Sequence, residues 1–303
     1  MSDTRLHKYD TMKGVLIFLM ILGHIIGEVG GGIIPHTVLF WIFTFHMPLF
    51  MAITGRFAQF KPIDSLLYIV LFLIFKTWFV LAVALYYLCI PLLARIKTKN
   101  LQLLAIAGSL LVGLLFGFLP LGNTHDTLTR CVTFFPYFLI GYYRVHEWVN
   151  IKHKTVLGIL LFAGTIFVMP LLYDTGIIPL FMCDQYGYHT IWHRIGAYCV
   201  GALWIAWISA GTPNKSYPII TKLGQYTLWI YLLHQPILPF VSAIVRRINQ
   251  MIGSQPFILQ IGVSIVWIIL LFPIAFILQK GMRWCMKQWK PINHFFQKKC
   301  LPK

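Results

Sequence analysis

Charged residues are scarce in this chain of 303 residues, and acidic residues are the scarcest. Asp, Glu, Lys and Arg together make up 11% of the chain, whereas they make up about 25% of a typical soluble domain. This shortage excludes an ordinary soluble protein. Instead, 58% of the residues are hydrophobic, and apolar runs of about 20 residues, the length that crosses a bilayer, recur along the chain. The sequence therefore predicts an all-α, polytopic membrane protein.

Cysteine pairs of the kind that bind metals are also absent from the sequence. The cysteines show no CxxC spacing and no histidine at the spacing of a metal site. Most of them lie in or beside apolar runs, where cysteine is usually a small core residue. We therefore expect no metal site, no disulfide framework and no bound cofactor. The six positions are Cys89, Cys131, Cys183, Cys199, Cys285 and Cys300.

Acidic residues are outnumbered by basic ones, 8 against 25, which gives a net charge of +17. In a soluble protein this charge would indicate a nucleic-acid partner. Here most of the Lys and Arg residues lie in short segments between the apolar runs, where their excess marks the cytoplasmic side of a membrane protein. We therefore expect no nucleic-acid partner, and a multi-pass protein of the plasma membrane.

Nine apolar segments are evident, and both termini are basic. Because basic flanks favour the cytoplasm, both termini are expected inside and the number of crossings should be even. Segment 64–93 has basic residues on both flanks and Lys76 near its middle, so it is predicted to cross twice. Ten spans result, in a single domain over 1–303 that ends in a basic cytoplasmic tail at 281–303. The predicted segments are 14–34, 37–55, 64–93 (as two spans), 101–120, 128–145, 155–173, 190–210, 221–244 and 256–280.

The first apolar run, KYDTMKGVLIFLMILGHIIGE over residues 8–28, carries ionisable groups that a plain membrane anchor does not need. Lys13 and His24 are eleven residues apart. On a helix this is three turns plus about 20°, so both lie on one face about 16 Å apart. Asp10 and Glu28 fall within about 60° of the same face. Because polar groups in a span usually face the interior of the bundle, this face is predicted to be functional.

Three histidines are predicted at the same depth in the membrane. Counted along their spans, His24, His46 and His234 all reach the middle of the bilayer. His46 or His234 alone is better interpreted as a hydrogen-bonded core residue, but three histidines together, with Glu28 close by, predict a polar cavity. A buried neutral imidazole serves as a general base, and a carboxylate one turn away orients it. A proton relay in a transporter would use the same groups, so the histidines alone leave both functions open.

Five segments stand out in order along the chain: YDTMKGVLIFLMILGH, FHMPLFMAITG, KTWFVLAVALYYL, RCVTFFPYFLIGYY and LGQYTLWIYLLHQPI. Together they resemble the integral-membrane acyltransferase-3 family, and the second is similar to its fucose 4-O-acetylase-like branch. The family signature in the first span is Asp, then Arg or Lys, then ten residues and His, here Asp10, Lys13 and His24. The family often has Arg at the place of Lys13, and Ser at the place of Thr54.

The resemblance implies a core of ten spans and transfer of an acyl group. The expected reaction moves acetyl from acetyl-CoA, as a co-substrate, to a hydroxyl of a cell-surface glycan or of its lipid-linked precursor. His24 would be the general base or a transient acyl carrier, oriented by Glu28 or alternatively by Asp10. The oligomeric state is left open.

The remaining candidate residues fall into two groups. Cations expected at the cytoplasmic side would attract the anionic donor; these are Lys13, Arg56 and Lys61, with Arg95, Lys97 and Lys99. Other polar residues would line the cavity or hold acceptor hydroxyls; these are His46, Arg130, His234, Asp126, His189, His193 and Arg194.

The alternative from another class is a transporter or flippase for a glycan or lipid-linked substrate, with the histidines carrying protons. Such a protein is expected to contain internal repeats with broken helices at matching positions, and the sequence shows no repeat. A purely structural membrane subunit would explain the apolar runs but not the polar face of the first one.

Overall fold

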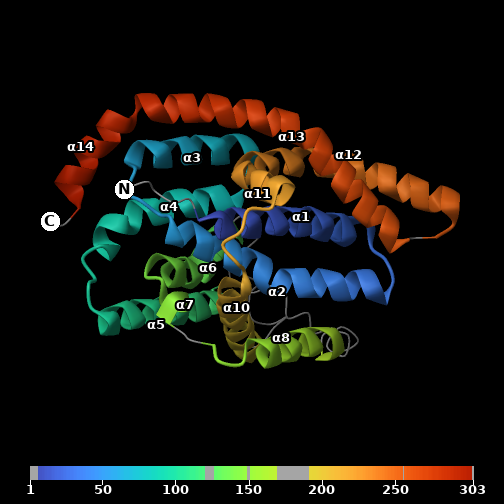
Figure 1. Ribbon diagram of the computed structural model, residues 1–303, viewed down its shortest axis with the longest axis horizontal. Coiled ribbons are helices and arrows are strands. Elements are labelled where there is room, and N and C mark those ends of the chain that lie inside the picture. The colour runs from blue at the N-terminus through green and yellow to red at the C-terminus, as the bar shows by residue number, and fades with distance from the viewer. Residues whose placement is uncertain (1–5, 120–125, 149–150, 169–190, 255, 302–303) are drawn as a thin grey trace. The chain divides into compact units, whose positions relative to one another are not determined.

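The computed structural model describes residues 6–119, 126–148, 151–168, 191–254 and 256–301 (Figure 1). Over these ranges every regular element is a helix, which confirms the all-α prediction. The helices before residue 120 are α1 (His7–Val29), α2 (Ile33–Arg56), α3 (Pro62–Phe75), α4 (Trp78–Leu93), α5 (Lys99–Leu115) and the short η1 (Phe116–Phe118). Those after it are α6 (Asp126–Tyr142), α7 (Val145–Trp148), α8 (Lys154–Ala163), η3 (Gly164–Val168), α10 (Ile191–Gly211), α11 (Pro218–Gln225), α12 (Thr227–Ile252), α13 (Phe257–Gln288) and α14 (Lys290–Cys300).

Six of the described helices are long and apolar enough to cross a membrane: α1, α2, α5 together with η1, α10, α12 and α13. The chain is therefore a membrane protein. It divides into two compact units. The first unit holds residues 1–46, 154–171 and 210–283, and the second holds 47–153, 172–209 and 284–303. The count of ten spans, the cytoplasmic termini and the single domain over 1–303 remain predictions.

In the first unit, α1 and α11 pack with their backbones in contact. A Cβ added at Gly14 of α1 would stand 2.1 Å from the carbonyl oxygen of Ile220, and one added at Gly224 of α11 would stand 1.8 Å from that of Asp10. The hydroxyls of Thr11 and Thr221 lie 2.9 Å apart across the same contact. Only glycine permits this approach, because any side chain would fill the space that the neighbouring backbone occupies. The contact fixes the start of α1, and α12 then follows beside α1.

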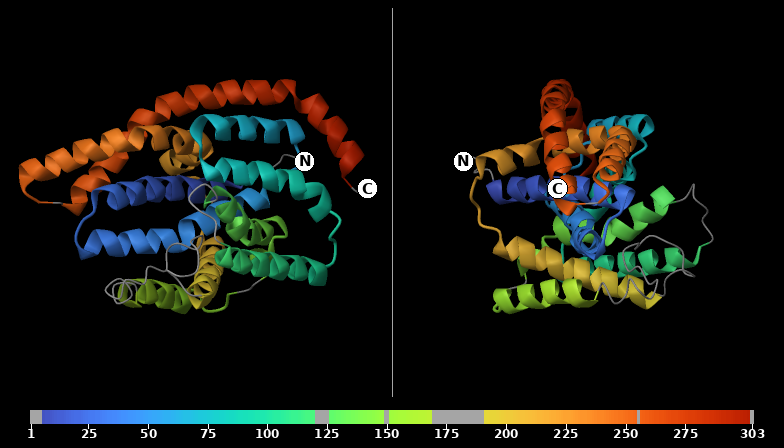
Figure 2. Two further views of the ribbon diagram at one scale, coloured as in Figure 1. Left: turned by 180° about the vertical axis from the view of Figure 1, so that it is seen from behind. Right: turned by 90° about the vertical axis from the view of Figure 1, so that its right-hand side faces the viewer.

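In the second unit, α3 and α4 form a hairpin that packs on α6 through α4 (Figure 2). Helix α3 ends at Lys76, which adopts the left-handed conformation with φ 53° and donates its N–H to Phe72. Helix α4 begins two residues later, at Trp78. The predicted division of segment 64–93 into two helices at Lys76 is therefore confirmed. At 14 and 16 residues, the two helices are about 21 and 24 Å long.

Several predicted boundaries were wrong. The first turn lies at Gly30–Gly32, not after residue 34, because Gly30 (φ 79°) and Gly31 (φ 157°) take backbone angles that only glycine adopts readily. Segment 221–244 is not one helix: α11 ends at Gln225, and α12 begins at Thr227, whose hydroxyl donates to the carbonyl of Gly224.

The C-terminal tail is helical almost throughout. Helix α13 continues beyond the predicted end at 280 to Gln288, and α14 follows after Trp289. The tail predicted at 281–303 is therefore the end of one long helix and a second, shorter helix that contacts α3. Three ends of predicted spans, at 120, at 169–173 and at 190, lie outside the described residues.

The close contact between α1 and α11 predicts that Gly14→Ala destabilises the protein. The new methyl group would overlap the carbonyl of Ile220, and overpacking of this kind costs about 1–3 kcal/mol. The midpoint of thermal unfolding in detergent should fall. Gly27→Ala is the matched control, because it is the same change in the same helix at a site with no heavy atom within 4 Å. Equal midpoints for the two variants would contradict the contact.

The hairpin predicts that Lys76 lies at the outer face of the membrane. Lys76 is exposed at the turn between α3 and α4. In a background without native cysteines, Lys76→Cys on intact cells should react with an impermeant maleimide. Reaction only after permeabilisation would rule out the ten-span topology. Labelling is read from the mass shift of the purified protein.

Candidate functional site

Two of the predicted histidines are in contact in the first unit. The rings of His24 on α1 and His234 on α12 have their centroids 5.1 Å apart, with the ring planes inclined by 37°. His234 is completely buried. Its Nδ1 donates a hydrogen bond to the carbonyl of Tyr231, so its Nε2 carries the lone pair. Among the described residues, no protein group hydrogen-bonds this Nε2. The pair therefore presents a buried nitrogen that is able to accept a proton.

Aromatic side chains line the histidine pair. The ring of Tyr231 lies 5.5 Å from that of His234, and the ring of Trp267 on α13 lies 6.2 Å from it. Trp267 is 3% exposed. These rings give the imidazoles an apolar wall, and electrostatic interactions are stronger beside such a wall than in open water. Trp267 was not predicted from the sequence, because its place beside His234 depends on how α12 and α13 pack. Tyr231 lies three residues before His234 on the same helix, a spacing that brings side chains together.

His46 lies close to the His24–His234 pair, but its hydrogen bond and its ring contact are made to residues of its own helix, α2. Its Nδ1 donates to the carbonyl of Ile42 at 2.9 Å, and its ring meets that of Phe43 edge-on at 5.0 Å. His46 and His24 are near enough for their charges to interact. The structure thus brings two of the three predicted histidines into contact, and the third lies within electrostatic range.

Asp10 and Lys13 form an ion pair at the start of α1. The Lys13 ammonium lies 2.9 Å from the Asp10 carboxylate, and the side chain of Lys13 is 29% exposed. Asp10 is fourteen residues before His24, which is about 21 Å along the helix. Asp10 therefore contacts Lys13 and is too far away to touch the imidazole.

Glu28 faces Arg246 on α12. Arg246 donates from Nη1 to the backbone carbonyl of Glu28 at 2.8 Å, and the same nitrogen lies 3.8 Å from the carboxylate. The sequence placed Glu28 against His24, but in the structure its ionic partner is Arg246. The ion pair also explains why a cation is present at position 246. In the ten-span topology Arg246 follows the span 221–244 and lies at the outer side of the membrane, where Lys and Arg are otherwise rare.

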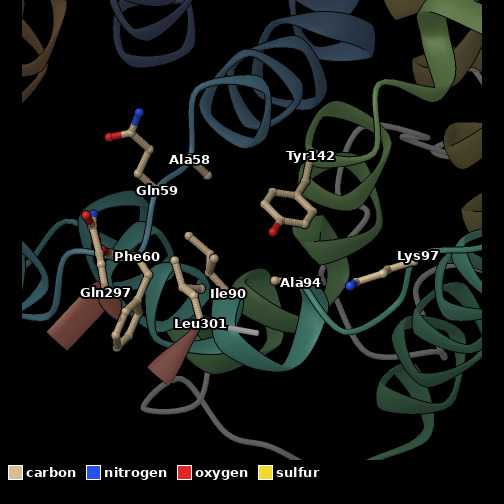
Figure 3. Close-up of a pocket in the computed structure, with 9 residues that line it drawn as sticks. All are labelled: Ala58, Gln59, Phe60, Ile90, Ala94, Lys97, Tyr142, Gln297 and Leu301. Atoms are coloured by element: carbon tan, nitrogen blue, oxygen red, sulfur yellow. Dashed lines mark hydrogen bonds between the residues drawn. The ribbon is translucent and has the colours of Figure 1, made fainter. Parts of the chain in front are cut away.

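The second unit contains a pocket of about 510 Å³ between its loops and helix ends (Figure 3). The Lys97 ammonium and the Tyr142 hydroxyl point into the space (Figure 3). A second pocket of about 520 Å³ shares both residues and adds Arg56 and Arg144. The lining of the first pocket is Ala58, Gln59, Phe60, Ile90, Ala94, Lys97, Tyr142, Gln297 and Leu301.

The C-terminal helix α14 forms one wall of this pocket and is held by specific hydrogen bonds. The amide of Asn293 donates to the carboxylate of Asp64 at 2.9 Å and accepts from the backbone N–H of Ile63 at 3.1 Å. Gln297 donates to the carbonyl of Phe60 at 2.8 Å. Because Gln297 also lines the pocket, the tail contributes directly to its shape. Sequence reasoning missed this role, since basic residues dominate the tail.

Of the predicted donor cations in this unit, Arg56 borders the second pocket and Lys61 precedes α3. The Arg56 guanidinium bonds the carboxylate of Glu147 at 2.8 Å. Arg56 therefore brings a partly neutralised charge to the pocket. Lys97 was also among the predicted donor cations, whereas Arg144 was not.

Three predicted acceptor residues of the second unit, Arg130, His193 and Arg194, lie on α6 and α10. Arg130 lies over the ring of Trp78 at 5.7 Å, and His193 is half-buried on α10. Arg194 is 3% exposed and donates to the carbonyl of Gly113 at 2.8 Å, which ties α10 to α5. Asp126 begins α6; its side chain and the whole of His189 lie outside the described residues.

These features define a membrane protein, helical in every regular element described, with two imidazoles in contact, one of them fully buried, and a pocket bordered by cations. Residues 59–278, more than two thirds of the chain, match the model of the acyltransferase-3 family, which is described as an acyltransferase domain. The chain belongs to this family. His234 and Tyr142 lie within the matched range, and His24 precedes it.

A shorter similarity exists to one curated protein. Over 58 residues the chain is 45% identical to nodulation protein NolL of Sinorhizobium fredii (strain NBRC 101917 / NGR234). The similar stretch covers 17% of this chain and 15% of that protein. No solved structure matches the chain.

Proposed function

We propose that this protein is a membrane O-acyltransferase of the plasma membrane that moves acetyl from acetyl-CoA to a hydroxyl of a cell-surface glycan or its lipid-linked precursor. The observation that carries the proposal is the contact between His24 and His234, which leaves a buried basic nitrogen inside apolar helices. Membership of the acyltransferase-3 family supports it. The likeness of the segment at 45–55 to the fucose 4-O-acetylase-like branch favours a sugar hydroxyl as the acceptor.

In the proposed reaction an imidazole nitrogen takes the proton of the acceptor hydroxyl. The hydroxyl oxygen forms a bond to the thioester carbonyl carbon, and the carbon–sulfur bond breaks. The departing thiolate then takes up a proton, so that the histidine returns to its neutral form. His24 performs this step as the base, or it carries the acetyl group transiently; His234 holds the ring beside it. The rings of Tyr231 and Trp267 form an apolar wall beside His234, which strengthens electrostatic interactions at the site.

The donor is assigned to the pocket of the second unit. Coenzyme A carries several phosphate groups, and phosphates are bound by Lys and Arg through charge-assisted hydrogen bonds. Lys97, Arg56 and Arg144 supply cations around this pocket, and Tyr142 adds a hydroxyl and an aromatic face. Lys61 adds positive charge as a further donor contact in the same unit. Each within its own unit, Lys13 is proposed to attract the donor, and Arg130, Asp126 and His193 are proposed to contact the acceptor.

The proposed chemistry predicts that His24→Ala abolishes acetylation. Loss of a general base typically lowers the rate by about 10²–10⁴-fold, which far exceeds the effect of one lost packing contact. The acetyl content of surface glycans is measured by mass spectrometry in cells that produce the wild type, the variant or no protein. Glu28→Gln, which keeps the shape of the side chain, should leave measurable activity.

The amount and thermal midpoint of the His24→Ala protein serve as the control for folding. Activity within a few-fold of wild type would make His24 a core residue and move the base to His234 or His46. A different result would favour the transporter or flippase. In that case, glycans from cells with the wild-type protein would carry no added acetyl, but more or less glycan would reach the surface than in cells without the protein.

The donor pocket predicts a specific effect of Lys97→Glu. Reversal of this charge should raise the acetyl-CoA concentration for half-maximal release of free coenzyme A by roughly tenfold or more, because a hydrogen bond to a charged group contributes about 1.5–3 kcal/mol. Lys152→Glu is the matched control: it makes the same charge change at an exposed lysine that does not line either pocket. Equal effects in both variants would mean that only overall charge matters. Release is followed in membrane vesicles with a thiol reagent.

A further inference from the structure

A row of buried polar side chains lies on one side of α12. His234 and Ser242 are fully buried, and Asn249 is 7% exposed. Ser242 is eight residues and Asn249 fifteen residues beyond His234, which places all three within about 80° of each other over a length of about 22 Å. Leu238 and Val245 are buried between them. The row therefore runs from the histidine pair toward the end of α12.

Helix α13 adds two members to this row. Gln260 is fully buried and donates from its amide nitrogen to the carbonyl of Gly30, at the end of α1. Trp267 is two helical turns further along the same face and lies against His234. Ser264, between them, donates to the carbonyl of Gln260. We refer to His234, Ser242, Asn249, Gln260 and Trp267 as the buried polar row.

Each member of the buried polar row carries a polar atom without a protein partner among the described residues. These atoms are Nε2 of His234, the hydroxyl of Ser242, both amide atoms of Asn249, Oε1 of Gln260 and Nε1 of Trp267. A buried donor or acceptor that stays unpaired is destabilising, and native proteins satisfy nearly all of them. Apolar residues would fill this space at lower cost. The atoms therefore indicate contact with water or with a ligand rich in hydrogen-bonding groups.

The chemistry of the row suits a polyhydroxylated ligand. It offers donors, acceptors and one aromatic surface but no acidic or basic side chain besides the imidazole. Hydroxyl groups both donate and accept, so they match serine, amide and indole groups equally well. An anionic ligand such as coenzyme A would instead require cations, and the row contains no Lys or Arg.

We propose that the buried polar row is the hydrated path along which the hydroxyl-bearing acceptor reaches the His24–His234 pair. The path begins at the Glu28–Arg246 ion pair, whose half-exposed side chains form its entrance. The inference rests on the proposed function for the identity of the ligand. The existence of a hydrated path is independent of that function and is tested separately.

The first test measures water access at Ser242. In a background without native cysteines, Ser242→Cys should react with a charged, membrane-impermeant methanethiosulfonate in open membrane fragments, because the reactive thiolate forms only where water reaches the sulfur. Leu232→Cys is the matched control, since Leu232 is also fully buried on α12 but lies about 160° away from His234 around the helix. We expect Ser242→Cys to react roughly tenfold faster. Equal, slow reaction at both positions overturns the path.

The second test concerns the acceptor. Asn249→Leu and Ser242→Ala remove the polar atoms without adding side-chain heavy atoms, so both should lower glycan acetylation several-fold and leave unchanged the acetyl-CoA concentration that gives half-maximal activity. Unchanged acetylation in both variants overturns the acceptor role, as does a rise in that donor concentration. If wild-type protein acetylates no glycan, the proposed function fails, while the labelling of Ser242→Cys still decides whether the path exists.

Discussion

Polar groups in this protein must find partners inside the protein, because the hydrocarbon of a membrane offers none. The structure meets this constraint largely with side chains that bond to backbone carbonyls of other helices. Arg194 bonds to the carbonyl of Gly113, Tyr198 to that of Thr133, and Gln260 to that of Gly30. Each bond holds a particular pair of segments together. The same constraint gives meaning to the groups that lack such partners, since they are costly unless a ligand or water contacts them.

Close backbone contacts are the second condition for the fold. In the first unit, Gly14 and Gly224 allow α1 to touch α11. In the second unit, a Cβ at Gly55 would stand 2.1 Å from the carbonyl oxygen of Phe138, and one at Gly141 would stand 1.8 Å from that of Ala52. Small residues at such crossings are typical of membrane helices, which associate through close packing rather than through the hydrophobic effect. Gly55 ends the segment at 45–55 that resembles the family, so this glycine has a packing role.

The two candidate binding regions differ in chemistry in a way that suits two different substrates. The pocket of the second unit is bordered by Lys97, Arg56 and Arg144 and is therefore suited to an anion. The buried polar row of the first unit holds amide, hydroxyl and indole groups around a histidine and is suited to hydroxyl groups. In a transfer reaction the donor and the acceptor must be recognised separately, and this division of chemistry provides for that.

The sequence by itself determined the helical class and the membrane environment, and it predicted the break between two helices at Lys76. These followed from apolar run length and from the distribution of Lys and Arg. It also singled out His24 and His234, from the cost of placing imidazoles among apolar residues; their role in a reaction stays a prediction. Polar residues in apolar runs were also visible at Ser242, Asn249 and Gln260, but spacing alone does not distinguish a bonded polar group from an unpaired one.

Tertiary structure alone decided that Glu28 pairs with Arg246, that Trp267 lies against His234, and that Gln297 of the tail lines a pocket. The physical reason is that each of these contacts joins segments far apart in the chain, whose rotation and register are set by side-chain packing that no local pattern encodes.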